Sequence, residues 1–169
     1  MTIHPLVAQL RFTRNEFVRC LQGVSPEDGM RLVMPMNSIS WTIGHMASQE
    51  HHYWVILPQG LNLAPDLYEL VGSGRPATTP PLKDMWAAWQ TITHAADPYL
   101  DSLTVDRLQE HLVNKGKPLA ENIGTLLHRN IYHYWFHTGE AHAIRQVLGH
   151  PDLPQFVGDI STTPYRPEE

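Results

Sequence analysis

Long apolar runs, basic clusters and cysteine pairs are all missing from this chain of 169 residues. No apolar stretch approaches the roughly 20 residues of a membrane-spanning helix, so we expect no insertion into a membrane. The chain holds 12 basic and 17 acidic side chains, a formal net charge of −5, without a cluster of Lys and Arg. Nucleic-acid binding needs a concentrated basic face, so neither that function nor binding to a membrane surface is expected.

Cysteine occurs once, at Cys20, which excludes an internal disulfide. A single cysteine fits a reducing compartment, and residues 1–5 lack the basic, apolar and small-residue order of a signal peptide. We therefore expect a cytoplasmic protein. Cys20 falls inside a helical pattern, where a buried thiol is expected rather than a nucleophile. Strand-type alternation of Val, Ile and Thr is also absent, so no sheet is predicted.

The residues that are present have the balance of a globular domain, with 42% apolar and 17% charged side chains. Apolar residues recur at helical spacing in four long segments. These segments are 5–23, 37–57, 79–100 and 119–148. A short helix is expected after the capping Ser25, and Pro98 is expected to kink or end the third long helix. The pattern predicts an all-α four-helix bundle over residues 1–150.

Two further stretches lack a helical pattern. Residues 59–78 connect the second and third predicted helices, and a connection this long is usually a crossover, a lid or a mobile segment. Residues 151–169 are rich in proline. We expect them to form an extended tail packed on the surface of the same domain.

The last predicted helix contains the sequence His-Tyr-Trp-Phe-His, from His133 to His137. Four residues are about one helical turn, so both imidazoles leave the same face, with Cβ atoms about 5–6 Å apart. His137 lies on the apolar stripe with His133 beside it, whereas His142 is expected to face solvent. Two imidazoles in this arrangement can bind one metal ion. Because the chain has 11 histidines, a chance pair of ordinary hydrogen-bonded histidines is the alternative.

A third ligand would come from the second predicted helix, which offers His45, His51 and His52. Small residues around His45, Gly44 among them, leave room for an ion. One helical stripe turns His45 and His52 inward, but a competing stripe through Ile43 turns His45 outward. Periodicity alone therefore leaves His45 and His52 as rivals.

Both histidine-bearing segments resemble the DinB-like superfamily of bacterial four-helix bundles. Residues 38–50, Ser-Ile-Ser-Trp-Thr-Ile-Gly-His-Met-Ala-Ser-Gln-Glu, are similar to its second helix. Residues 133–150 are similar to its last helix, with paired histidines, a Gly-Glu step and a closing Ile-Arg-Gln-Val-Leu-Gly. The resemblance implies a bundle with a long crossover between helices 2 and 3. It places the three metal ligands of the family at His45, His133 and His137.

The superfamily includes YfiT-type metal-dependent hydrolases and thiol-dependent transferases. Three neutral imidazoles would leave a divalent metal, Zn or Ni, with open coordination positions, as in catalytic sites. The resemblance implies that the ion activates water for hydrolysis, or a low-molecular-weight thiol for transfer, toward a small-molecule substrate. Glu50 and Glu140 are candidate catalytic carboxylates, as general bases or as partners of the histidines, and solvated surface acids are the alternative.

The alternative function is a non-catalytic, stress-associated bundle that binds a metal. A structural zinc ion normally has four protein ligands, so this function would require His52 to turn inward as the fourth. The resemblance and the five Trp and six Tyr residues also predict a homodimer.

Overall fold

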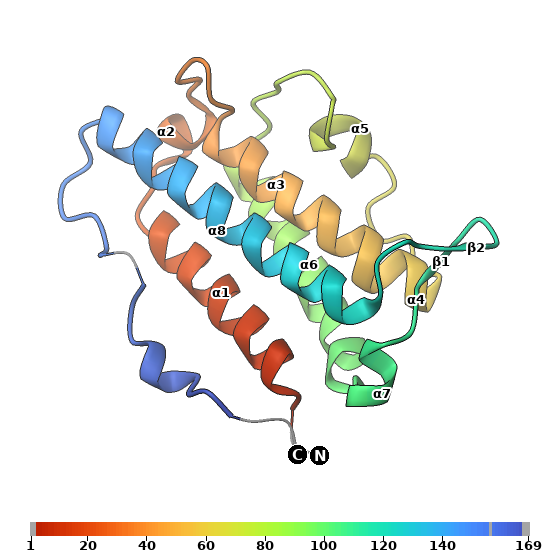
Figure 1. Ribbon diagram of the computed structural model, residues 1–169. Coiled ribbons are helices and arrows are strands. Elements are labelled where there is room, and N and C mark those ends of the chain that lie inside the picture. Colours follow the sequence, from red (N-terminus) through yellow and green to blue (C-terminus); the bar gives the residue numbers. More distant parts are fainter. Residues whose placement is uncertain (1–2, 156, 167–169) are drawn as a thin grey trace.

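Four long helices dominate the computed structural model, which describes residues 3–155 and 157–166 (Figure 1). The bundle confirms the predicted all-α fold. Its long helices are α1 (Pro5–Leu21), α3 (Ile39–Glu50), α6 (Leu82–Asp101) and α8 (Ile123–Val147). Shorter elements are α2 (Pro26–Met30), η1 (His51–Ile56), α4 (Leu57–Gln59), α5 (Leu67–Val71), α7 (Val105–Leu108), β1 (Val113–Asn114), β2 (Lys117–Pro118) and η2 (Ile160–Thr162).

The helices pack as α1 against α8 and α3 against α6, and α3 also contacts α8. The connection between α3 and α6 returns to the end of the bundle where α3 begins, so these two helices run in the same direction (Figure 1). This is the predicted crossover, and α5 within it packs on α3. Apolar side chains of all four helices form the core, among them Leu10, Phe17, Ile43, Ile92 and Leu127. Burial of these side chains provides the main free energy that holds the helices together.

Polar caps explain where several helices begin. Ser38 accepts a hydrogen bond from the backbone N–H of Trp41, and Asn122 accepts one from Thr125. Ser25 caps α2, as predicted. Each cap satisfies a backbone donor that the first helical turn leaves free. The last long helix therefore begins at Ile123 rather than near residue 119.

Two features of the local structure differ from the predictions. Pro98 was expected to kink or end the third long helix, and it does not end it, because α6 continues to Asp101. Proline removes one backbone donor, but the final turn is held by Leu100, which is fully buried in the core. The chain also contains a small antiparallel sheet of β1 and β2. Its turn places Lys115 and Gly116 at positive φ values of 50° and 77°, a conformation that glycine adopts without strain.

The second predicted helix is longer and less regular than expected. After α3 the chain continues as the π-helix η1 and the short α4, and ends at Gly60 with a φ of 70°. Pro58 lies within this final turn. None of the described helices has both the length and the apolar character needed to cross a bilayer.

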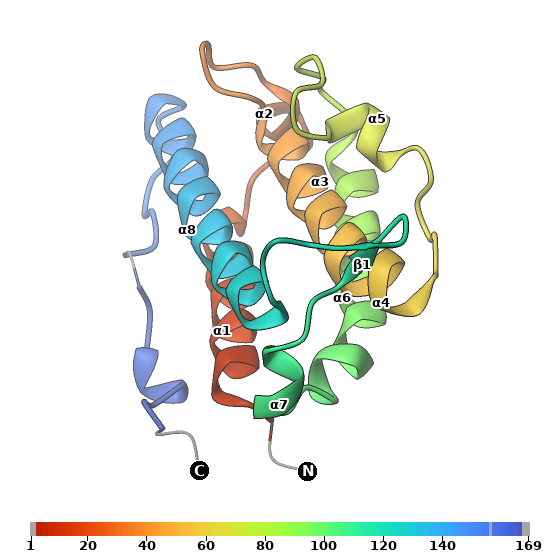
Figure 2. The ribbon, with the colours of Figure 1, turned by 45° about the vertical axis from the view of Figure 1, so that its right-hand side comes forward.

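The described part of the C-terminal tail follows α1 (Figure 2). The backbone N–H of Gly158 donates to Glu16 at 2.7 Å, and Arg19 donates to the carbonyl of Gln155 at 2.7 Å. Gln9 donates to the carbonyl of Thr163. The tail is mostly extended, and the short 3-10 turn η2 interrupts it.

Candidate metal centre

Three imidazoles from two helices meet between α3 and α8. Nε2 of His133 lies 3.2 Å from Nε2 of His45 and 2.9 Å from Nε2 of His137. The ligand atoms of the three side chains all lie within 4.8 Å of one another. The structure thus brings together the three residues that the resemblance singled out. His52 is not part of this group.

The other ring nitrogen of each histidine faces an oxygen atom of the protein. Nδ1 of His45 lies 2.9 Å from the carbonyl oxygen of Val71. Nδ1 of His133 lies 2.7 Å from Oε1 of Gln49. Nδ1 of His137 lies 2.6 Å from Oε2 of Glu140. Each Nδ1 therefore carries the proton and donates it, because the oxygen opposite can only accept.

These hydrogen bonds determine the tautomer of all three rings. With a proton on every Nδ1, each neutral imidazole has a lone pair on Nε2, and the three lone pairs converge. Such an arrangement is unfavourable without a cation between the nitrogens. Three imidazole nitrogens, each oriented by an oxygen acceptor on its far side, are the donor set that Zn²⁺ and similar ions bind. The residues present therefore fit a divalent metal ion.

Burial keeps these imidazoles neutral. Desolvation first, and then the proximity of the other histidines, lower the pKa of His133 to about 4 and that of His137 to about 3, and Arg129 lowers the pKa of His133 further. Desolvation also lowers the pKa of His45, against a smaller opposing effect of its hydrogen bond to Val71. Only a neutral imidazole can bind a metal, so the site is in its binding form at neutral pH.

The surroundings of His45 explain why its direction was ambiguous in the sequence. α3 is buried along both competing stripes, from Ile39 to Ser48. Trp41 stacks on the ring of His45, with centroids 4.5 Å apart. The room beside Gly44 is not used by an ion, because a Cβ there would meet the side chains of Val71 and Met85. Gly44 is instead needed for the close packing of α5 and α6 on α3.

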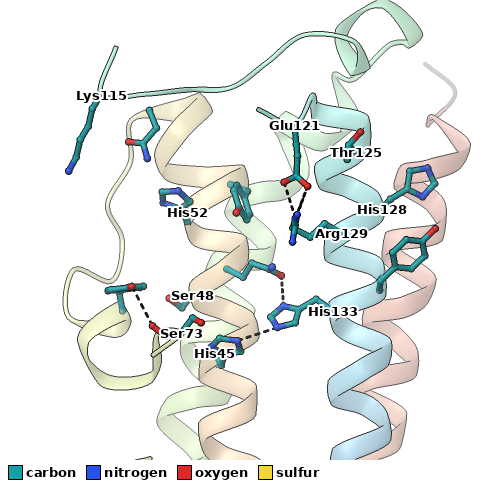
Figure 3. A pocket seen from close by; sticks show the side chains of 15 residues that line it. His45, Ser48, His52, Ser73, Lys115, Glu121, Thr125, His128, Arg129 and His133 are labelled. Carbon is teal, nitrogen blue, oxygen red and sulfur yellow. Dashed lines mark hydrogen bonds and ion pairs between the residues drawn. The ribbon is translucent and has the colours of Figure 1, made fainter. Parts of the chain in front are cut away.

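A pocket of about 1020 Å³ opens beside the histidines (Figure 3). His45, Ser48 and His52 line one wall, and Arg129 and His133 belong to the wall that α8 forms. The crossover contributes Tyr68 and Ser73, and the β-hairpin contributes Asn114 and Lys115. Within the pocket Arg129 pairs with Glu121. The connection of residues 59–78 is therefore a wall of the pocket.

Comparison with protein families agrees with this geometry. The family model for Mycothiol-S-transferase matches residues 5–149 of the chain. The chain belongs to the mycothiol S-transferase family. This family is part of the DinB/YfiT-like superfamily, as the resemblance indicated. A search of curated proteins finds no match to the chain.

Membership of the mycothiol S-transferase family indicates a metal-dependent enzyme that acts with a small thiol. In this member of the family, Glu140 contacts one of the three histidines directly, and 35% of its side-chain surface is exposed. Burial raises the pKa of Glu140. Glu140 is therefore placed to orient the ring of His137 by this hydrogen bond.

In this member of the mycothiol S-transferase family, Glu50 makes no hydrogen bond to the three histidines. Its side chain is fully buried, so the alternative of a solvated surface acid is wrong. It forms a two-point ion pair with Arg14 and accepts a hydrogen bond from the hydroxyl of Tyr134 at 2.6 Å. Burial, and then the charge of Glu50, raise the pKa of Tyr134, which keeps its hydroxyl protonated as a donor.

The other residues considered in the sequence analysis do not belong to the group of three histidines. Nε2 of His51 accepts a hydrogen bond from the backbone N–H of Leu63, so this ring holds the crossover. His52 is half-buried in the pocket wall. His142 is half-buried rather than exposed and lies outside the site. Cys20 is buried, as expected, and donates to the carbonyl of Thr138. Gln49 and Val71 were missed, because no sequence pattern shows which oxygen atoms lie behind the histidines.

Proposed function

We propose that this chain is a metal-dependent thiol S-transferase. His45, His133 and His137 would hold a divalent ion, Zn²⁺ or Ni²⁺, and the adjoining pocket would accept a low-molecular-weight thiol of the mycothiol type and an electrophile. One observation carries the proposal: three Nε2 lone pairs converge while every Nδ1 donates to a protein oxygen. The family match supports the choice of a thiol as the nucleophile.

When bound, the ion supplies Lewis acidity, which lowers the pKa of a thiol or water molecule that coordinates it. In the proposed reaction the S–H bond breaks, a bond forms from sulfur to carbon, and the leaving group departs with its electron pair. The proton of the thiol passes to solvent. The protein's own residues hold the three imidazoles neutral, fix their tautomers and provide a pocket for both reactants.

Three ligands also distinguish this proposal from the non-catalytic alternative. A structural zinc site usually has four protein ligands. Among the described residues, the group within metal-binding distance contains only three, and His52 is not one of them. Three protein ligands leave coordination positions open for a reactant.

Metal analysis tests the ligand set. Elemental analysis of the purified protein should find one divalent ion per chain, and the His137→Ala variant should lose it. His94→Ala is the matched control, because His94 is an exposed histidine on α6. Unchanged stoichiometric metal in His137→Ala would exclude this site.

An activity assay tests the reaction. The metal-loaded protein should catalyse the transfer of mycothiol to a bimane halide, and chelation of the metal should abolish the activity. Ester hydrolysis that proceeds without any thiol would instead support a hydrolase. If the metal-loaded protein transfers the thiol to none of several electrophiles, the proposal is contradicted.

The homodimer stays a prediction. Tyr132 and Phe136 lie one turn apart on α8, and 65% and 62% of their surfaces are exposed. We propose that a dimer would bury this aromatic pair. Sedimentation of the wild type and of Phe136→Ser tests it, and a wild type that sediments as a monomer would contradict the dimer.

A further inference from the structure

Gln49 connects the metal centre to the pocket. It lies on α3 one turn after His45 and is one of the residues that line the pocket. Its carbonyl oxygen accepts two hydrogen bonds, from Nδ1 of His133 at 2.7 Å and from Nδ2 of Asn130 at 2.8 Å. The first of these hydrogen bonds fixes the tautomer of His133.

The orientation of the Gln49 amide is determined by a chain of hydrogen bonds. The indole N–H of the buried Trp54 donates to Oδ1 of Asn130 at 2.8 Å. An indole nitrogen can only donate, so Asn130 must turn its oxygen toward Trp54 and its NH₂ group toward Gln49. Gln49 must then turn its oxygen toward both Asn130 and His133. A flipped amide would place donor against donor at two contacts.

This orientation leaves the NH₂ group of Gln49 free. Among the described residues, Nε2 of Gln49 has no hydrogen-bond partner, and it is not one of the buried unpartnered atoms. It is therefore accessible to solvent, and the residue that carries it lines the pocket. Two N–H donors thus lie next to a candidate metal ligand with nothing in the protein to receive them.

We propose that Gln49 binds the substrate as well as positioning His133. Its carbonyl oxygen holds His133 for the metal, and its NH₂ group donates to an acceptor oxygen, of a carbonyl or carboxylate, close to the reacting atom of the thiol or of the electrophile. This inference rests on the proposed function, because it takes the pocket as the place where the two reactants meet.

Two substitutions separate the two roles. Gln49→Glu keeps an oxygen that can accept from His133 and Asn130, but it replaces the NH₂ donors with a second acceptor. Gln49→Met has a similar length and removes both the acceptor and the donors. Gln90→Glu makes the same chemical change on the exposed surface of α6, outside this pocket, and is the matched control.

The first measurement is the affinity for Zn²⁺, by competition with a chromophoric chelator. We expect Gln49→Met to bind Zn²⁺ about 10–100-fold more weakly, the usual effect of removing the partner of a metal-bound histidine. Gln49→Glu should bind Zn²⁺ at least as tightly as the wild type. An unchanged affinity in Gln49→Met would overturn the positioning role.

The second measurement is the steady-state kinetics of the metal-loaded variants with mycothiol and a bimane halide. In Gln49→Glu the KM for one reactant should rise about tenfold, the equivalent of one lost hydrogen bond, while kcat changes by less than about twofold. The reactant whose KM rises is the one that carries the acceptor oxygen. Both KM values unchanged in Gln49→Glu would overturn the substrate-binding role.

The two measurements also separate this inference from the proposed function. A wild type without thiol transfer overturns the proposed function and, with it, the substrate-binding role. The Zn²⁺ affinities still decide the positioning role in that case, because they need no turnover. Gln90→Glu should equal the wild type in both measurements, and circular dichroism of each variant checks that the fold is retained.

Discussion

Nδ1 of His137 lies 2.6 Å from a carboxylate oxygen of Glu140, three residues further along α8. Both side chains belong to one helix, and their spacing of three residues brings them together on its surface. The partners of the other two histidines are the backbone oxygen of Val71 and the amide oxygen of Gln49. Glu140 is thus the charged acceptor among the three. A carboxylate partner increases the basicity of a metal-bound imidazole more than a neutral oxygen does.

Replacing Glu140 with Gln should weaken metal binding without unfolding the protein. The amide still accepts from His137, but it lacks the charge, so we expect the Zn²⁺ affinity to fall about tenfold, the lower end of such effects. Competition with a chelator measures the change. Glu110→Gln is the control, since Glu110 is exposed and outside the site. Equal affinities in Glu140→Gln and the wild type would contradict this role of Glu140.

Glu50 should matter for stability rather than for metal binding. Glu50→Gln leaves the buried Arg14 without its main counter-charge, so the free energy of unfolding should fall by about 3 kcal/mol. Urea denaturation measures this loss. The control Glu69→Gln removes the partner of Arg75 in an exposed ion pair, and should change it by less than about 1 kcal/mol. A Glu50→Gln variant of normal stability that lacks activity would restore the catalytic interpretation.

The sequence predicted those features of the fold and of the site that depend on local periodicity. The spacing of His133 and His137 put both imidazoles on one face of a helix, and the structure agrees. His45 could not be chosen over His52 by pattern, because α3 is buried along both stripes. Only the family resemblance distinguished them. The turn at Lys115 and Gly116 does carry a signal, an Asn-Lys-Gly sequence typical of tight turns, which strand periodicity does not detect.

What could not be predicted depends on contacts between distant segments. Arg14 and Glu50 are 36 residues apart, and a charged residue in a helical pattern gives no sign that its counter-charge is buried with it. The carbonyl of Val71 reaches His45 only because α5 packs on α3. Nor does the sequence of η1 contain a known signal for a π-helix.

Gly44 allows the close contact that places Val71 behind His45. A Cβ at this position would clash first with Sδ of Met85 and would also lie 3.1 Å from Cγ2 of Val71, closer than normal packing. Gly44→Val should therefore cost about 1–3 kcal/mol of stability and weaken Zn²⁺ binding, because the carbonyl of Val71 moves with its side chain. Thermal unfolding and chelator competition measure the two effects. In the control Gly139→Ala the new Cβ meets nothing within 4 Å, and a loss of Zn²⁺ affinity there equal to that of Gly44→Val would refute this explanation.

Acid should release the C-terminal tail. The hydrogen bond from Arg19 lowers the pKa of Glu16, the N–H of Gly158 lowers it further, and burial opposes both. A carboxylate with a lowered pKa contributes stability above its unfolded pKa of about 4.3, and loses that contribution as the pH falls through the folded pKa. The protection of amides near Gly158 from hydrogen exchange, relative to the intrinsic rate at each pH, should therefore fall below about pH 4, and Glu16→Gln should lack this protection already at pH 7. Slow exchange in Glu16→Gln at pH 7 would show that another contact holds the tail. The control is Glu27→Gln, which makes the same change at an exposed carboxylate.

Metal binding should stabilise the bundle without being needed for its folding. The core is made of apolar side chains from all four helices, so the chelated protein should keep its helical circular dichroism and unfold cooperatively. A free Zn²⁺ concentration of about 100 times Kd adds about 2.7 kcal/mol of stability, which corresponds to a rise in Tm of about 5–10 °C for a chain of this size. Calorimetry with and without chelator measures this rise, and His137→Ala should show none of it. Loss of the helical signal on chelation would identify a structural ion and favour the non-catalytic alternative.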